Sequence, residues 1–289
     1  MRASKTNLAV LALALLVALA FLFHRGPKEQ KPPRTAPRAV EVAAPESPTR
    51  AAPLPVKPVS DPAPAPSAPP PAQRPPGTVR GAVKIRGEIP LRKRIRLDAD
   101  SKCEAMHAGV VLSDQLVADA NGNVQWAFVF VKAGPIGTPP PAPTTPVLLD
   151  QIRCVFTPHM VGVRVGQPIR VLSSDDVLHN VHALPFTNKE FNVGLPRGGM
   201  EVVRTFDQPE VMLKIKCDVH PWMASWVGVV DHPYFAVTNE LGSYVIRDLP
   251  PGKFTLEVWH EMYKSVAHSV DIPPGGDVAL DFVLDDKKY

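Results

Sequence analysis

The sequence predicts an all-β protein with two small β-sandwiches, preceded by an apolar N-terminal segment and a proline-rich linker. Short runs of β-branched and aromatic residues recur through residues 77–289, separated by turn residues. No stretch of these residues keeps the 3.6-residue apolar period that an amphipathic helix would show. A proline-rich interruption at residues 134–146 divides the strand runs, which favours two domains.

Residues 1–24 are predicted to be a signal peptide or a membrane anchor. Arg2 and Lys5 precede sixteen consecutive apolar residues, 8–23, as in secretion signals. Residues 18–20 (Ala-Leu-Ala) fit a cleavage site, whereas the apolar run continues past it to nearly bilayer length, which favours an uncleaved anchor. We therefore expect an extracytoplasmic protein on the periplasmic side of the inner membrane, with a cleaved signal as the alternative.

Residues 25–76 are predicted to be a disordered linker, because they hold 17 of the 35 prolines and few large apolar residues. Such a segment favours polyproline II structure and would act as a semi-rigid spacer.

The charge distribution argues against nucleic acid as a partner. The whole chain has a net charge of +4, but residues 1–76 carry the basic excess and leave residues 77–289 at −2. The folded part therefore lacks the net positive charge of a nucleic-acid-binding domain.

Strands are expected in three successive regions of the folded part. In residues 77–143 they are 79–85 and 124–131, the second following the Asn121-Gly122 turn signal. In residues 144–231 they are 154–156, 160–165, 169–172, 202–206, 211–215 and 226–230. In residues 232–289 they are 235–238, 244–246, 254–259 and 279–284.

One constellation of side chains predicts a metal centre. Cys217, His220 and Met223 lie within seven residues, and His179 lies 38 residues before the cysteine. A thiolate, two imidazoles and a weak thioether are the ligands of blue-copper electron-transfer sites. We therefore expect one type 1 copper ion bound by His179, Cys217, His220 and Met223.

Residues 156–230 resemble the cupredoxin family, in particular amicyanin, through an F-x-P and V-x-V-G-Q opening, an H-N motif and a C-x2-H-x2-M loop. The resemblance implies a Greek-key β-sandwich at residues 144–231 and the four ligands above. It also implies that Asn180 ties the two ligand-bearing segments together and that Pro221, which matches a proline of the short loop, lies around the ligands without binding the metal.

The arrangement of the ligands leads us to expect His220 at the surface, because Cys217 and Met223 would point inward from a loop held at both ends by strands and His179 would be held inside by its own strand. Pro221 and Trp222 would then surround its edge with apolar surface, making Trp222 the docking residue for redox partner proteins. The sequence departs from the family at 173–176 (Ser-Ser-Asp-Asp), where cupredoxins commonly have an asparagine. This departure leaves the hydrogen bonding around the ligands undetermined.

Two cysteines and several histidines remain. Cys103 and Cys154 are expected to form a disulfide, since leftover cysteines usually pair in an oxidising compartment. The alternative is a second metal site that uses Cys103 with His107 or Cys154 with His159. The remaining histidines without an evident partner are interpreted as structural: His159, His182, His232 and His260.

Residues 232–289 resemble the C-terminal part of the carboxypeptidase regulatory-like sandwich, an Ig-like module, through A-V-T-N-E-L-G-S-Y-V-I and L-P-P-G-K-F-T-L-E-V. They lack that module's first strands, which residues 77–143 would supply with their G-x-V-x-G-x-V opening. The predicted organisation is a cupredoxin domain inserted into this second sandwich. The alternative is a serial arrangement in which residues 78–133 belong to the cupredoxin.

The expected function is electron transfer between extracytoplasmic redox partners at a membrane, without enzymatic activity or a small-molecule substrate. Copper storage or delivery is the alternative, although the seven methionines are scattered. A third hypothesis is a non-redox interaction module with incidental copper. Further Cys-His ligand sets, which a multicopper oxidase would need, are missing from the sequence.

Overall fold

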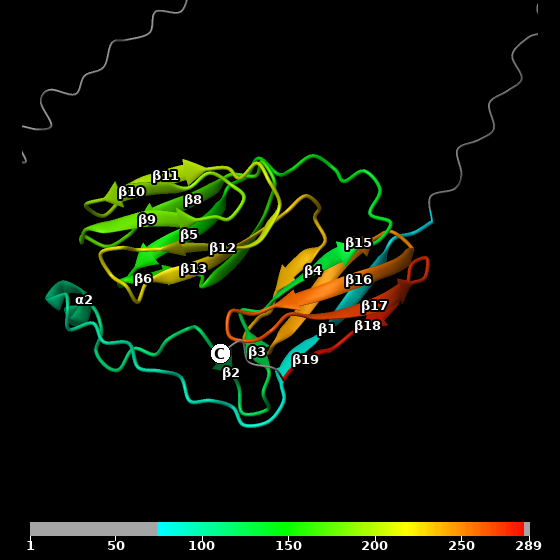
Figure 1. Cartoon of the computed structure of the whole chain (residues 1–289), viewed down its shortest axis with the longest axis horizontal. Coiled ribbons are helices and arrows are strands. Elements are labelled where there is room, and N and C mark those ends of the chain that lie inside the picture. The colour runs from blue at the N-terminus through cyan, green and yellow to red at the C-terminus, as the bar shows by residue number, and fades with distance from the viewer. Residues whose placement is uncertain (1–73, 286–289) are drawn as a thin grey trace, which may run out of the picture. The chain divides into compact units, whose positions relative to one another are not determined.

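The computed structural model describes residues 74–285, which form an almost entirely β protein (Figure 1). The predicted all-β class is therefore confirmed. The anchor or signal at residues 1–24 lies outside the described residues, as does nearly all of the linker predicted at residues 25–76. In the described part of the chain, no helix has the length and apolar character of a membrane span.

Two sheets built from residues 147–230 enclose the first core. The five-stranded sheet has the order β10-β9-β12-β13-β7 and the four-stranded sheet the order β11-β8-β5-β6. Their bounds are β5 Val147–Ile152, β6 Val155–Thr157, β7 Met160–Arg164, β8 Ile169–Ser173, β9 His179–Leu184, β10 Phe191–Leu195, β11 Glu201–Arg204, β12 Glu210–Lys216 and β13 Ala224–Val230. Alternate residues of β5 and β8 are buried, as two-layer packing requires, whereas β7 and β13 also contain consecutive buried residues.

Two further sheets enclose a second core and combine strands from both ends of the described chain. One has the order β15-β1-β18, with β19 also paired to β1, and the other has the order β14-β4-β16-β17. Their bounds are β1 Gly77–Ile85, β4 Phe128–Ala133, β14 Phe235–Val237, β15 Ser243–Leu249, β16 Gly252–Trp259, β17 Val266–Ile272, β18 Asp277–Ala279 and β19 Phe282–Leu284.

In these two sheets, strands that precede residue 144 pair with strands that follow residue 231. β1 lies between β15 and the last two strands, and β4 lies between β14 and β16. This pairing supports a sandwich interrupted by residues 144–231, which we propose as the domain organisation. Within the interrupting segment, β7 and β13 pair with each other in the five-stranded sheet and not with strands of the second sandwich.

Glycines allow close packing where the two sandwiches meet. Gly162 in β7 and Gly228 in β13 are paired in register. A Cβ at Gly228 would collide with the Phe128 ring, and one at Gly162 with the Phe235 ring. The two aromatic rings therefore lie directly on bare backbone.

The segment between β1 and β4 differs from expectation. The predicted strand 124–131 is divided into β3 (Val124–Gln125) and β4, because Trp126 adopts a positive φ of 64°. β2 (Val117–Ala118) pairs with β3.

Earlier in this segment, the short helix α2 (Ser101–Ala105) carries Cys103, which is buried in the core of the first sandwich rather than the second. This segment was expected to belong to the second sandwich.

Candidate metal centre

The four predicted ligands lie at the start of β9 and in the loop that connects β12 to β13. His179 is the first residue of β9, and Cys217 directly follows β12, which pairs with β9. His220 and Met223 lie in the loop between β12 and β13. This loop is closed by hydrogen bonds from Cys217 N to Met223 O (3.1 Å) and from Met223 N to His220 O (2.9 Å). Strand pairing and a short closed loop thus fix the backbone positions of the four predicted ligands.

Three ligand atoms converge in a buried space. His179 Nδ1 lies 3.0 Å from His220 Nδ1, and Cys217 Sγ lies 3.8 Å from His220 Nδ1. The residues His179, Cys217 and His220 are at most 1% exposed. Met223 is also 1% exposed and lies in the same core cluster as Cys217. One thiol and two imidazole nitrogens facing one another is the donor set that copper prefers, and the residues therefore fit this metal.

Each predicted imidazole ligand donates its outer N–H to a carboxylate. His179 Nε2 is 3.0 Å from Asp175 Oδ2, and His220 Nε2 is 3.2 Å from Asp100 Oδ2. A histidine that donates from Nε2 keeps the lone pair of Nδ1 free for a metal. The two aspartates thereby turn the Nδ1 atoms toward each other.

Asp175 occupies the region where the sequence departs from the cupredoxin pattern. It is 5% exposed and also accepts hydrogen bonds from the backbone N–H of Arg153 (2.6 Å) and Cys154 (2.7 Å). Burial alone would raise the pKa of Asp175, but the hydrogen bonds from His179, Cys154 and Arg153 outweigh burial and lower this pKa.

The protonation of Cys217 also favours metal binding. Burial would raise the pKa of its thiol, but His179 and the backbone amides of Asn180, His220 and Val219 outweigh burial and lower this pKa. A thiolate is the form of cysteine that binds metal. For His179, burial opposes the charged form, but Asp175 and Cys217 raise the pKa to about 9, so a metal that binds Nδ1 near neutral pH must displace a proton from it.

Asn180 joins the two ligand-bearing segments, as the family resemblance implied. Its Oδ1 accepts from Asp218 N (2.6 Å), while its Nδ2 donates to Asp218 Oδ2 (2.9 Å) and to Asn192 Oδ1 (2.6 Å). The residue after the first histidine is therefore bonded to the residue after the cysteine. Pro221 lies in the ligand loop and is exposed, whereas Asn180 is buried.

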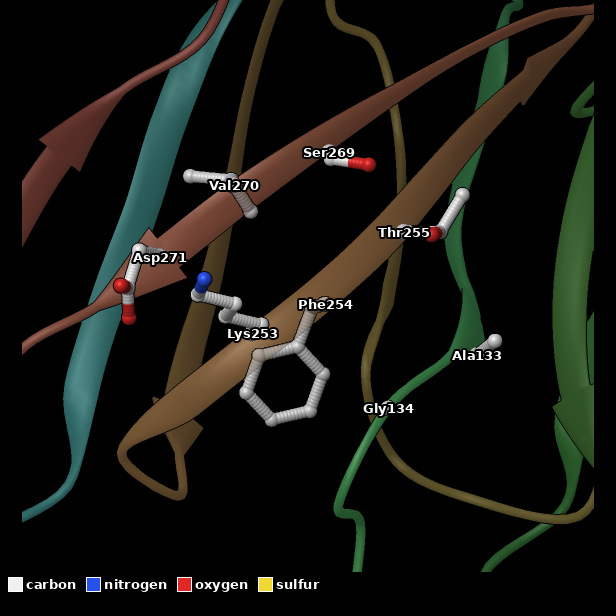
Figure 2. Close-up of a pocket in the computed structure, with 8 residues that line it drawn as sticks. All are labelled: Ala133, Gly134, Lys253, Phe254, Thr255, Ser269, Val270 and Asp271. Carbon is white, nitrogen blue, oxygen red and sulfur yellow. The ribbon is translucent and has the colours of Figure 1, made fainter.

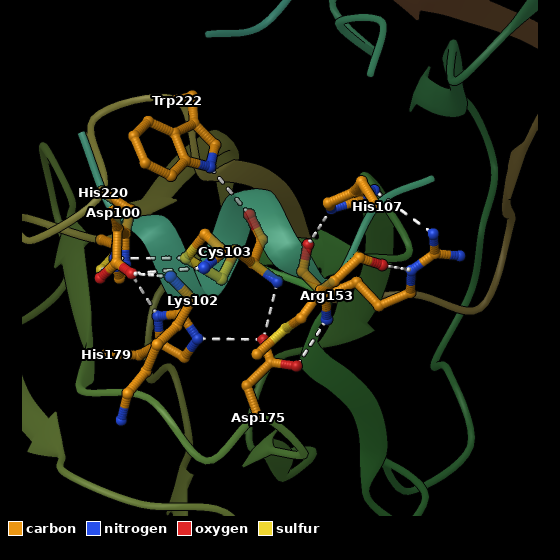
Figure 3. The surroundings of a disulfide bond; sticks show 12 residues. Asp100, Lys102, Cys103, His107, Arg153, Asp175, His179, His220 and Trp222 are labelled. Atoms are coloured by element: carbon orange, nitrogen blue, oxygen red, sulfur yellow. Dashed lines mark hydrogen bonds and ion pairs between the residues drawn. A yellow bond between two sulfur atoms is a disulfide. The ribbon is translucent and has the colours of Figure 1, made fainter. Parts of the chain in front are cut away.

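His220 does not face solvent, and our expectation for it is wrong. It is 1% exposed because α2 and the residue before it cover its outer edge (Figure 3). Asp100 hydrogen-bonds Nε2, and Cys103 Sγ lies 3.5 Å from the same nitrogen. Trp222 is half-buried, with its ring centroid 5.0 Å from that of His220, and its Nε1 donates to Cys154 O (2.9 Å).

Cys103 and Cys154 form a disulfide with a Cα–Cα distance of 5.6 Å, and both residues are fully buried. The disulfide attaches α2 to the loop between β5 and β6. The alternative second metal site is ruled out, because neither cysteine is free. His107 instead hydrogen-bonds Arg153 O through Nε2 (2.7 Å).

The four histidines that were interpreted as structural make hydrogen bonds to groups other than the predicted ligands. His159 Nε2 lies 2.5 Å from Glu261 Oε1, and His232 Nε2 donates to Val131 O (2.8 Å). His182 bridges Asp218 and Glu190. His260 Nδ1 accepts from Met262 N (3.1 Å).

Sequence reasoning missed the two aspartates that hold the imidazoles. Asp175 lies four residues before His179, so the D-x-x-x-H spacing was a usable signal. Asp100 lies 120 residues before His220 and only the fold brings them together.

A hollow of about 470 Å³ lies in the second sandwich, on β4, β16 and β17 (Figure 2). It is lined by Ala133, Gly134, Lys253, Phe254, Thr255, Ser269, Val270 and Asp271. None of these is a predicted metal ligand, and the two charged residues are cross-strand neighbours. The hollow thus belongs to a different part of the molecule from the metal centre.

One part of the chain matches a known family. Residues 227–285 match the sequence model of the carboxypeptidase regulatory-like domain, which confirms the resemblance stated for residues 232–289. The matched stretch includes β14 to β19 but not β1 or β4. A search of curated protein sequences gives no match.

Solved structures similar to this chain include cupredoxins. The Cu(I) form of an amicyanin variant is 19% identical, over 35% of this chain and 97% of that chain, with a TM-score of 0.27. A purple cupredoxin from Nitrosopumilus maritimus is 25% identical, over 26% and 81%, with a TM-score of 0.23. A copper-containing nitrite reductase from Thermus scotoductus is 20% identical, over 29% of this chain and only 22% of the reductase, with a TM-score of 0.27.

Proposed function

We propose that the chain is a type 1 copper protein that transfers single electrons between extracytoplasmic redox partners at a membrane. The observation that carries the proposal is the buried convergence of His179 Nδ1, His220 Nδ1 and Cys217 Sγ. A bound copper ion would supply a one-electron Cu(II)/Cu(I) couple. Cys217 would provide the thiolate and Met223 the weak axial thioether.

The protein's contribution is to hold one donor arrangement in both oxidation states. Strand pairing fixes His179, the closed loop fixes Cys217 and His220, and the aspartates fix both imidazoles. A site that is already in place needs little rearrangement when an electron arrives or leaves. Burial also keeps water away from the ligands.

A carrier is favoured over an enzyme because all four predicted ligands are protein side chains and all are buried. Catalytic metal sites keep a coordination position open for substrate or water. Burial likewise disfavours storage or delivery, in which the metal must leave. The disulfide between Cys103 and Cys154 supports the extracytoplasmic location, since such bonds persist in oxidising compartments.

The test is to add one equivalent of Cu(II) to the metal-free full-length chain and record visible and EPR spectra. We expect an intense blue thiolate-to-Cu(II) charge-transfer band that disappears on reduction with ascorbate and returns with ferricyanide. Cys217→Ser should abolish the band while keeping the native circular dichroism spectrum. Tight copper binding without this band would instead favour storage or delivery and overturn the proposal.

A further inference from the structure

The outer edge of His220 is covered by an aspartate that lies outside the inserted domain. Asp100 Oδ2 accepts from His220 Nε2 at 3.2 Å, and the His220 side chain is 2% exposed. His220 is the ligand that we expected to face solvent. In this chain, therefore, a carboxylate takes the place that solvent would occupy beside the ligand.

Asp100 is fixed independently of His220. Its Oδ1 caps α2 by accepting from Lys102 N (2.9 Å) and Cys103 N (3.3 Å), which leaves Oδ2 for the imidazole. The disulfide from Cys103 to Cys154 then attaches the helix to the sandwich that holds the predicted ligands. Figure 3 shows Asp100, Cys103 and His220 together at this attachment.

The Asp100 side chain also marks the boundary between the metal centre and solvent. It is 28% exposed, whereas the His220 side chain is 2% exposed. Asp100 lines a surface hollow together with Leu178 and Val219, the residues that directly precede the two predicted histidine ligands. The carboxylate is thus in contact with both the buried imidazole and the solvent at this edge of the site.

We propose that Asp100 is a positioning residue of the copper centre, holding His220 with Nδ1 toward the metal and favouring the divalent oxidised state through its negative charge. The proposal rests on the proposed copper-binding function. The hydrogen bond selects the Nε2–H tautomer, which presents the Nδ1 lone pair. A nearby anion stabilises Cu(II) more than Cu(I), because the interaction energy scales with the charge of the ion.

Three variants of the full-length chain separate these effects. Asp100→Asn keeps the cap of α2 through its one oxygen, but it removes the charge and places an NH2 donor instead of an acceptor beside His220 Nε2. Asp100→Ser keeps a good helix cap, but its side chain is too short to reach the imidazole. Asp98→Asn removes the same charge two residues away, where the carboxylate is exposed and pairs with Arg96.

The first measurement uses metal-free protein and ¹⁵N NMR of the imidazoles. We expect His220 to be the Nε2–H tautomer in the unmodified chain and in Asp98→Asn, the Nδ1–H tautomer in Asp100→Asn, where the amide NH2 donates to Nε2, and a mixture of tautomers in Asp100→Ser. The second measurement is the reduction potential after Cu(II) is added. Asp100→Asn and Asp100→Ser should each favour reduction about tenfold, equivalent to about 59 mV for a one-electron couple. Asp98→Asn should change this equilibrium less than twofold.

An unchanged His220 tautomer in Asp100→Ser would overturn the positioning role. Equal potentials in Asp100→Asn and Asp98→Asn would overturn the electrostatic role. Failure of the proposed function has a different signature, because the unmodified chain would then form no blue Cu(II) centre. The tautomer measurement still determines whether Asp100 orients His220 in that case.

Discussion

The sulfur of Cys103 lies 3.5 Å from Nε2 of His220, so a disulfide is in direct contact with a predicted copper ligand. The two residues are 117 positions apart. The contact arises because the disulfide to Cys154 holds α2, which contains Cys103, against the ligand loop. This disulfide therefore serves both to stabilise the fold and to cover the site.

Removing the disulfide should destabilise the protein and uncover His220. The partners are 51 residues apart in sequence, and closing a loop of that length contributes about 4 kcal/mol in the chain-entropy description. We expect Cys103→Ala/Cys154→Ala to lower the free energy of unfolding by about that amount in urea titrations.

In the same double variant, diethyl pyrocarbonate should modify His220 in metal-free protein, as detected by mass spectrometry. The exposed His268 serves as the internal reference, since it should react equally in both proteins. Protection of His220 in the double variant would show that the helix stays in place without the disulfide.

The buried carboxylate of Glu210 should make stability depend on pH. It is 8% exposed and accepts from the backbone N–H of Phe186 (2.6 Å), Thr187 (3.1 Å) and Asn188 (3.1 Å). Burial would raise the pKa of Glu210, but these hydrogen bonds outweigh burial and lower it. Its stabilisation is therefore fully present above the unfolded-state pKa, about 4.3, and is lost as pH falls through the lower folded-state pKa.

Glu210→Gln should cost about 2 kcal/mol near neutral pH, since hydrogen bonds to a charged group are the stronger ones. The loss should shrink as pH falls below about 4. Urea unfolding across this range measures both effects, with the exposed Glu240→Gln as the matched control. A difference between Glu210→Gln and the parent that stays constant with pH would contradict the assignment.

Trp222 remains our proposed docking residue, because its half-buried ring lies beside His220 and Pro221 next to it is exposed. Trp222→Lys should slow electron self-exchange between Cu(I) and Cu(II) protein about tenfold or more, since two like charges would meet in a small contact. The blue spectrum should change little. NMR line broadening in mixtures of the two oxidation states gives the rate.

Phe186→Lys is the matched control for this substitution. Phe186 is 95% exposed and follows β9 at the end opposite to His179. The same added charge there should leave self-exchange nearly unaltered. If both variants slowed self-exchange equally, the added net charge and not a docking surface at Trp222 would be the cause.

The interrupted sandwich should make the C-terminal segment unable to fold alone. Residues 232–289 lack β1, which pairs with β15, β18 and β19, and β4, which joins β14 to β16. We expect no cooperative thermal unfolding of this fragment by circular dichroism. Residues 144–231, which contain both sheets of the first sandwich, should fold and bind copper. Cooperative unfolding of residues 232–289 would reject the insertion.

Much of the fold could be predicted because its signals are local. Alternating apolar residues predicted β16 nearly to its ends, and the Asn121-Gly122 turn is present, with Gly122 at a φ of 79°. The predicted ligands His179, Cys217 and His220 could be identified because residue type and spacing alone define the donor set.

The covering of His220 could not be predicted, because no local pattern connects Asp100 to it. A five-residue helix is too short to show an apolar period, and its position depends on one long-range disulfide. The division of the predicted strand 124–131 at Trp126 also lacks a sequence signal, since a tryptophan rarely adopts positive φ.

The parallel pairing of β1 with β19 has a consequence for the order in which the chain folds during synthesis. Val83 lies opposite Phe282, so this sheet cannot be completed until almost the entire described chain has been made. Every residue of the first sandwich, including the ligand loop, is available once residue 230 has been added. Since domains generally fold as units as they emerge, the sandwich with the predicted ligands can form while its host is still incomplete. During synthesis the core of the first sandwich can therefore form before the core of the second sandwich is complete.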